Sequence, residues 1–200
     1  METVKLGVAY MGSYLPWHLE QDLEDIYNSG CDEVLVNLQE NDFHYQWGKA
    51  QFSARIAHKI GLKAIVNFWG YACMLDGGGM SKLLTDNPES WQVNREVRRI
   101  GVGCMNNPAV YSTLMEMTED AASHDFDGFF IDELNRDECF CKHCQEGYKR
   151  EYSASIFEAT PKNLLQFRRR LVVKFIERVF KGVKAIDPRL ETLTCIMPKD

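Results

Sequence analysis

The chain has 200 residues, 45% of them hydrophobic, and a formal net charge of −6 at pH 7. This size and composition allow one globular domain or slightly more, with a sizeable core. The acidic balance argues against a nucleic-acid partner or an anionic membrane surface, because counterion-release binding needs a basic face.

Strand-like and helix-like patterns alternate along the chain. Five β-rich runs predict strands at residues 4–11, 31–39, 62–70, 126–133 and 190–197. Helical stripes between them predict helices from residue 19 to Gly30, from 52 to Gly61, from Pro108 to 121 and from 163 to 186. A long excursion containing DGGGMSKLLTDNPESW follows the third strand, and connections of this length are usually functional.

Strands that each lead into a crossover indicate a parallel α/β fold, either a doubly wound sheet or a (β/α)8 TIM barrel. The first turn, YMGSYLPW, lacks the GxGxxG of a dinucleotide-binding sheet, and no Gly-Lys-Ser/Thr follows the GGG run. These features favour the barrel. A complete barrel needs about 250 residues, so we expect residues 1–200 to form its first five β/α units.

In such barrels the functional groups lie at the C-terminal ends of the strands. Reading those ends predicts a substrate-binding set of amides and aromatic rings: Tyr10, Asn37, Asn67 and Trp69. Amides pair with sugar hydroxyls and rings pack on the C–H face of a sugar, so the set suits a carbohydrate. The alternative is that these side chains fill the barrel mouth.

Two carboxylates, Asp132 and Glu133, end the fourth predicted strand. An acid at the end of an apolar strand is partly desolvated, and the raised pKa that follows suits a general acid that protonates a leaving-group oxygen. Asp132 points to the other side of the strand by alternation, so a second carboxylate for glycoside hydrolysis is expected elsewhere. The alternative is that both acids only solvate a strand end.

Seven cysteines include the run Cys139-x-Cys141-x-x-Cys144, which suits a tetrahedral zinc better than a disulfide framework. Cys104 is the obvious fourth ligand, with His143 or His124 as substitutes. Reduced, unligated cysteines are the alternative. The metal interpretation points to a reducing compartment. The N-terminus lacks a signal peptide and no apolar run reaches membrane length, so we expect a cytoplasmic protein without a membrane partner.

Three segments resemble the family 42 glycoside hydrolases, largely β-galactosidases, and related glycosidases that share their barrel. They are SYLPWHLEQDLEDIYNSGCDEVLVN, NPESWQVNREVRRIGVGCMNNPAVY and DELNRDECFCKHCQEGYKREY. The resemblance implies a structural zinc on Cys104, Cys139, Cys141 and Cys144, and an acid/base role for Glu133.

This sequence departs from the family pattern at two places. Asp132 stands where the family has asparagine, which affects recognition of the sugar 2-hydroxyl because a carboxylate cannot donate a hydrogen bond. The gap from Glu133 to Cys139 is also a few residues shorter. The family's nucleophile is on the seventh strand, beyond the 200 residues.

Two classes of function are the main ones compatible with these patterns, and a thiol redox protein is a weaker third. The leading one is a glycoside hydrolase acting on a carbohydrate substrate, with the 200 residues alone incomplete and nearly inactive. The other is a non-catalytic, zinc-braced domain that binds carbohydrate or a protein. A barrel with five strands also leaves edges exposed, so association into homo-oligomers is expected.

Overall fold

The computed structural model describes residues 5–45, 47–74, 80–132 and 138–195. The chain folds into two compact units. The first comprises Met1–Trp69, Met117–Asp132 and Val183–Asp200, and the second comprises Gly70–Glu116 and Glu133–Gly182.

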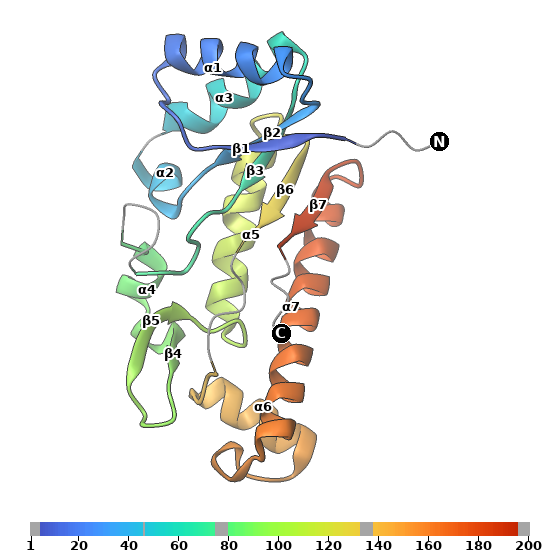
Figure 1. The fold of residues 1–200 in the computed structure, drawn as a ribbon. Coiled ribbons are helices and arrows are strands. Elements are labelled where there is room, and N and C mark those ends of the chain that lie inside the picture. Colours follow the sequence, from blue (N-terminus) through green and yellow to red (C-terminus); the bar gives the residue numbers. More distant parts are fainter. Residues whose placement is uncertain (1–4, 46, 75–79, 133–137, 196–200) are drawn as a thin grey trace. The chain divides into compact units, whose positions relative to one another are not determined.

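The first unit is built on a parallel sheet of five strands in the order β1-β2-β3-β6-β7 (Figure 1). These strands are β1 (Gly7–Tyr10), β2 (Glu33–Asn37), β3 (Lys63–Asn67), β6 (Gly128–Ile131) and β7 (Glu191–Thr194). All five lie within the predicted runs. Their spatial order follows the chain without a reversal, which confirms the barrel-type arrangement over the doubly wound one.

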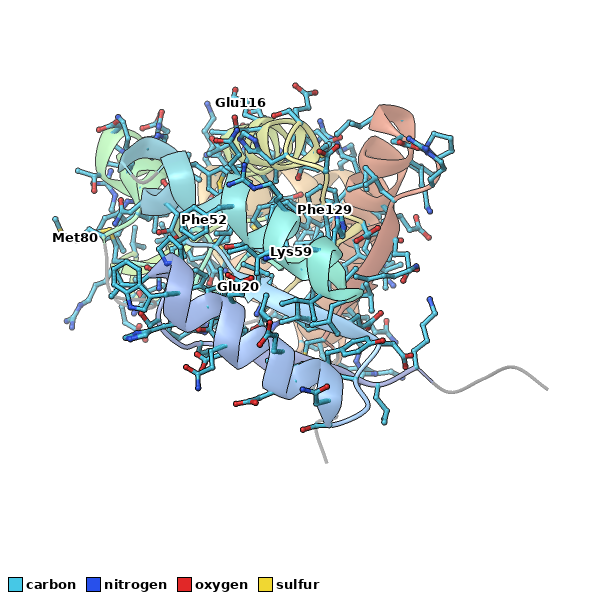
Figure 2. The ribbon with its side chains drawn as sticks, turned by 90° about the horizontal axis from the view of Figure 1, so that it is seen from above. Glu20, Phe52, Lys59, Met80, Glu116 and Phe129 are labelled. Carbon is cyan, nitrogen blue, oxygen red and sulfur yellow. The ribbon has the colours of Figure 1, made fainter. Side chains whose placement is uncertain are left out.

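Helices cover one face of this sheet. They are α1 (Pro16–Asn28), α2 (Glu40–Tyr45), α3 (Trp47–Ile60) and the parts of α5 (Pro108–Ala122) and α7 (Pro161–Ile186) that belong to the first unit. Figure 2 shows α1 beside α3, where Lys59 and Glu20 form an ion pair. Gly30 and Gly61 both have positive φ and follow α1 and α3, as their sequence positions predict.

Side chains alternate between two faces of the strands. Val34, Val36, Ala64, Val66 and Phe129 point to the helix-covered face and are buried. The opposite face, which we call the inner face, carries the residues at the intervening positions. Register sets Asn37 opposite Asn67, and Asn67 opposite Phe130, on that face.

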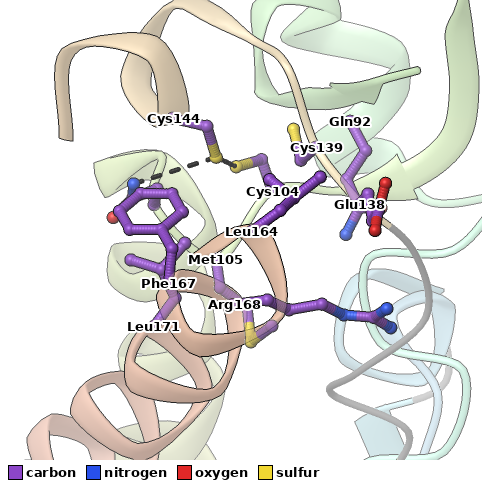
Figure 3. A pocket seen from close by; sticks show the side chains of 11 residues that line it. Gln92, Cys104, Met105, Glu138, Cys139, Cys144, Leu164, Phe167, Arg168 and Leu171 are labelled. Carbon is purple, nitrogen blue, oxygen red and sulfur yellow. Dashed lines mark hydrogen bonds between the residues drawn. The ribbon is translucent and has the colours of Figure 1, made fainter. Parts of the chain in front are cut away.

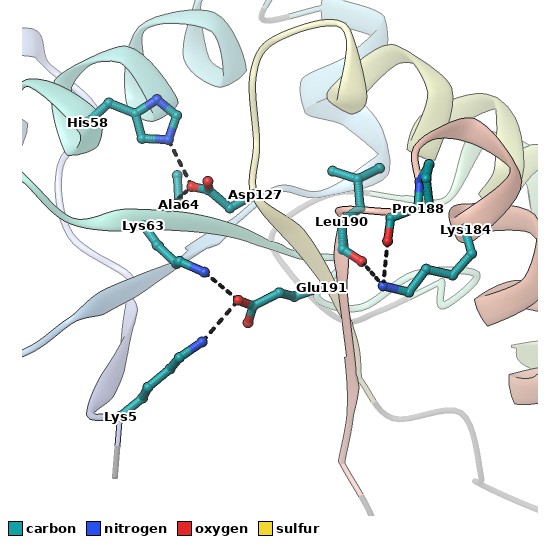
Figure 4. Close-up of polar contacts among 9 residues, drawn as sticks. All are labelled: Lys5, His58, Lys63, Ala64, Asp127, Lys184, Pro188, Leu190 and Glu191. Carbon is teal, nitrogen blue, oxygen red and sulfur yellow. Dashed lines mark hydrogen bonds and ion pairs between the residues drawn. The ribbon is translucent and has the colours of Figure 1, made fainter. Parts of the chain in front are cut away.

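Ion pairs on the inner face link strands that are not neighbours. Glu191 of β7 pairs with Lys63 of β3 and, at 3.0 Å, with Lys5, which precedes β1 (Figure 4). The position on β6 in register with Glu191 is Gly128, where an added Cβ would lie 2.8 Å from the Glu191 Cβ. Contacts across the face indicate that the sheet curves toward this side, as a barrel wall does.

The second unit contains an antiparallel hairpin of β4 (Trp91–Val93) and β5 (Arg99–Gly103), which lies in the long connection after the third predicted strand. Its helical elements are α4 (Lys82–Asp86), the 3-10 helices η1 (Pro88–Ser90) and η2 (Ile156–Glu158), α6 (Lys142–Tyr152) and parts of α5 and α7. No helix in the described part of the chain is long and apolar enough to cross a membrane.

Candidate metal centre and strand-end site

Four cysteines meet in the second unit. The sulphur atoms of Cys104, Cys139, Cys141 and Cys144 all lie within 4.8 Å of one another. The Cys104 sulphur is 3.5 Å from those of Cys141 and Cys144. A tetrahedral zinc with Zn–S bonds of about 2.3 Å places its sulphurs about 3.8 Å apart, so the cluster has the dimensions of such a centre.

Local structure places these thiols. Cys104 directly follows β5, and its N–H donates to the Ser90 carbonyl at 2.7 Å. Cys141 is the N-cap residue of α6, and Cys144 lies in that helix's first turn. Between Cys139 and Cys141, the Phe140 N–H donates to the Val93 carbonyl at 2.7 Å, which fastens the cysteine loop to β4.

An apolar shell surrounds the cluster. Cys104, Cys141 and Cys144 are buried, whereas Cys139 is partly exposed. The shell consists of Phe140, Tyr148, Ile156, Leu164 and Phe167. His143 and His124 do not join the cluster; of the described residues that could hold a metal ion, only the four cysteines gather here.

One amide supports the cluster from outside. Asn106 Nδ2 lies 3.8 Å from the Cys144 sulphur and donates to the His143 carbonyl at 3.3 Å. A Cβ added at Gly147 would be 3.1 Å from this nitrogen, so glycine at that position leaves space for the amide. Donors of this kind orient metal ligands and tune them.

Hydrogen bonds among the four thiols separate their pKa values. The pKa of Cys141 is lowered, first by its hydrogen bond with Cys104, and the pKa of Cys139 is lowered for the same first reason. The pKa of Cys144 is raised, first by its hydrogen bond with Cys104, and the pKa of Cys104 is raised, first by Cys139. Four-fold coordination requires four thiolates, so metal uptake here would release protons.

A cavity of about 30 Å³ lies against Cys104, Cys139 and Cys144, with Glu138 and Arg168 also in its lining (Figure 3). A water needs about 10–15 Å³ of such volume, so the cavity has room for water but not for a sugar. A second hollow of about 10 Å³ is lined by Asp42 and other residues of the first unit and is smaller still. Neither hollow is a substrate pocket.

In the first unit, two amides meet at the ends of adjacent strands. Asn67 Nδ2 donates to Asn37 Oδ1 at 2.6 Å, and the two residues are only 3% and 5% exposed. Asn37 Nδ2 and Asn67 Oδ1 have no hydrogen-bond partner among the described residues. The pair therefore holds one unpaired donor atom and one unpaired acceptor atom, both buried, at the C-terminal ends of β2 and β3.

A network that the sequence patterns did not reveal supports this edge. The Tyr14 hydroxyl donates to the Asn37 carbonyl at 3.0 Å, and Lys49 Nζ lies 3.9 Å above the Tyr14 ring. Lys49 also pairs with the buried Asp42 at 2.7 Å. The pKa of Tyr14 is raised, first by burial and then by Asp42. Asp42 is on α2 and Lys49 is on α3, so the pair joins two elements and no helical spacing in the sequence marked it.

The structure places the other predicted strand-end residues differently. Tyr10 points to the helix-covered face, where its hydroxyl donates to Asp22 of α1 at 2.7 Å, and burial raises its pKa. Tyr10 is thus separated from the amide pair by the sheet.

The remaining predicted residues follow the strand ends. Trp69 is partly exposed just after Asn67, and Asp132 is partly exposed after β6. Asp132 directly follows β6, and the same alternation continued by one residue predicts the inner face for it. Glu133 lies outside the described residues.

No protein-family model matches the chain. No curated protein matches it either. Similar solved structures include alpha-L-fucosidase isoenzyme 2 from Paenibacillus thiaminolyticus, with 15% identity and a TM-score of 0.68 over 98% of this chain and 32% of that chain. The alpha-galactosidase from Thermus thermophilus has 13% identity and a TM-score of 0.54, over 96% of this chain and 38% of that one. GH5_18 from Streptomyces cattleya has 15% identity and a TM-score of 0.57, over 96% of this chain and 44% of that one.

These neighbours are (β/α)8-barrel glycosidases, and the likeness shows that the chain has a glycosidase-like barrel fold. The chain spans less than half of the length of each of the three. At identities of 13–15% the likeness speaks for the fold alone.

Proposed function

We propose that the first unit carries part of the substrate site of a glycoside hydrolase, β-galactosidase-like in the manner of family 42. The observation that supports this most is the amide pair of Asn37 and Asn67, with one buried donor and one buried acceptor unpaired among the described residues. Leaving such groups unpaired costs about 1–3 kcal/mol each. Sugar hydroxyls both donate and accept, so one or two of them satisfy both groups.

For the reaction we propose Glu133 as the general acid that protonates the leaving-group oxygen, a role that the family resemblance implies. Asp132 is proposed to accept a hydrogen bond from a substrate hydroxyl, because it directly follows β6, the strand that carries Phe130. Glycoside hydrolysis needs a second carboxyl group. We propose that this group comes from a barrel strand beyond the five described.

In the second unit we propose a structural Zn²⁺ held by Cys104, Cys139, Cys141 and Cys144. Four thiolates leave no open position for water, so such an ion braces the fold and takes no part in hydrolysis. Elemental analysis of the purified protein should give about one zinc per chain, and Cys144→Ser should reduce it. Native protein with all seven thiols freely titratable and no metal would remove this proposal.

Hydrolysis tests the catalytic assignment, using the protein encoded by the complete reading frame. Glu133→Gln should slow hydrolysis of methyl β-galactoside by about 10²- to 10⁴-fold, because this leaving group needs a proton. The first step with 2,4-dinitrophenyl β-galactoside should be spared, and added azide should restore its turnover. Asp132→Asn serves as the matched neighbour and should be much milder. Unchanged activity of Glu133→Gln on both substrates would show that the acid is misassigned.

The second candidate is a non-catalytic, zinc-braced domain that binds carbohydrate or a protein. The separate apolar core around the cysteine cluster favours it, because the described residues of that core are thiols and apolar or aromatic side chains. Saturable sugar binding without turnover, in a complete chain that retains Glu133, would support this candidate over the hydrolase.

A further inference from the structure

Phe130 holds a position that the sequence patterns did not single out. It belongs to β6, in register with Asn67 of β3, which is itself in register with Asn37 of β2. Residues in register on parallel strands point to the same face. The inner face therefore carries two amides and an aromatic ring side by side in one row.

The exposure of β6 agrees with this placement. Gly128, Phe129 and Ile131 are buried, whereas Phe130 is partly exposed. Phe129 points the other way and stacks on Phe68, with ring centroids 5.7 Å apart. The backbone at Phe130 is held in place, because its carbonyl accepts a hydrogen bond from the Phe68 N–H at 3.1 Å. Phe130 thus offers accessible ring surface on a fixed strand.

The spacing of the row suits one sugar ring. Neighbouring strands are about 4.8 Å apart, so Phe130 is about 5 Å from Asn67 and about 10 Å from Asn37 along the row. A pyranose has hydroxyls on its edge and C–H groups on its faces. Asn37 Nδ2 and Asn67 Oδ1 are buried, so a sugar reaches them only when the side chains around them move. A pyranose whose hydroxyls bind the two atoms in that state would have a C–H face within reach of Phe130.

We propose that Phe130 is the apolar platform of the substrate site, stacking on the C–H face of a pyranoside whose hydroxyls bind the Asn37–Asn67 pair. This inference rests on the proposed function and narrows its ligand to cyclic sugars with an apolar face. An open-chain polyol carries the same hydroxyls without the ring face, so the row should discriminate between the two.

Proton NMR of the ligand tests the stacking directly. The probes are methyl β-D-galactopyranoside and galactitol. Binding to the wild-type protein should shift sugar C–H protons upfield through the Phe130 ring current, and galactitol should bind more weakly without this shift. Phe130→Leu should abolish the upfield shift and weaken binding by about 3- to 10-fold. Phe130→Trp, which enlarges the platform, should keep the shift.

Control variants distinguish a failure of the proposed function from a failure of the role given to Phe130. Val173→Ala, an exposed apolar position on α7 in the second unit, should change neither the shift nor the affinity. Asn67→Ala should abolish galactoside binding if the proposed function holds. Absence of galactoside binding in the wild-type protein would overturn the proposed function. Binding that depends on Asn67 but keeps its upfield shift in a folded Phe130→Leu variant would overturn only the role of Phe130.

Discussion

Two consecutive asparagines before α5 have different partners. Asn106 lies against the Cys144 sulphur, at 3.8 Å. Asn107 is the N-cap of the helix, because its Oδ1 accepts from the Ala109 N–H at 2.9 Å, and its Nδ2 donates to the Glu89 carbonyl at 3.0 Å. The Asn106 amide thus contacts the thiol cluster, whereas the Asn107 amide caps the helix.

This pair gives a matched test of the metal centre. Asn106→Ala removes a donor to a thiolate and should lower metal affinity about 10-fold with little change in the stability of the metal-free protein. Asn107→Ala removes a cap and should lower the free energy of unfolding by about 1 kcal/mol with metal affinity unchanged. Competition with a zinc chelator and thermal melts measure the two effects. Equal metal affinities for both variants would contradict the role given to Asn106.

For single residues, the sequence predicted which residue types gather better than it predicted the face of the sheet toward which their side chains point. The spacing of three cysteines was sufficient to suspect a metal loop, because close thiols have few other uses. Asn37 and Asn67 were among the predicted strand-end residues, but Phe130 was not, since a shift of one residue in register sends every side chain to the other face. Phe129 and Phe130 look alike in the sequence, and only pairing with β3 distinguishes them.

The pairing of strands β6 and β7 depends on glycine at position 128, because there is no room for a side chain there. A Cβ at Gly128 would lie 2.7 Å from the Glu191 carbonyl oxygen and 3.0 Å from Ile65 Cδ1. The first contact is with a backbone atom, which cannot move away by a change of rotamer as a side-chain atom can.

Gly128→Ala should therefore destabilise the protein by about 1–3 kcal/mol, as overpacking does. Gly48→Ala is the matched control, because its Cβ would make ordinary contacts on α3, 3.6 Å from Phe52. There alanine should stabilise the helix by up to about 1 kcal/mol. Denaturant unfolding of both variants measures the difference. A Gly128→Ala protein as stable as the wild type would show that the strands are not packed as described.

The elements themselves were largely predictable. The five parallel strands are apolar runs with many β-branched residues, and two of the helices between them end at glycines that the sequence marks. The hairpin of β4 and β5 was not predicted, because β4 has only three residues and β5 begins with a charged one. Its structure comes from pairing and from the contact with Phe140, which local sequence patterns do not report.

At the scale of the whole molecule, both outer strands of the five-stranded sheet lack a second neighbour in the described part of the chain. β1 is largely exposed, and Leu6 just before this strand and Val8 within it are 56% and 37% exposed. Unpaired edges with apolar side chains favour association.

We therefore expect the 200-residue protein to form dimers or larger species at micromolar concentration. Val8→Lys should shift it toward monomer, because a charge on an edge strand blocks pairing with another chain. Val173→Lys, at an exposed position on α7, is the control and should have no such effect. Light scattering coupled to size exclusion measures both. A monodisperse wild-type monomer would contradict this expectation.

Recognition of a sugar by the inner face of the sheet, which we propose to occur through Asn37 and Asn67, is open to direct measurement. An NMR titration of the side-chain amide resonances with methyl β-D-galactopyranoside tests it. We expect saturable shifts of the Asn37 and Asn67 amide resonances, with the Asn106 and Asn107 amide resonances unmoved. No shift of the Asn37 and Asn67 amides, or shifts confined to Asn106 and Asn107, would contradict it.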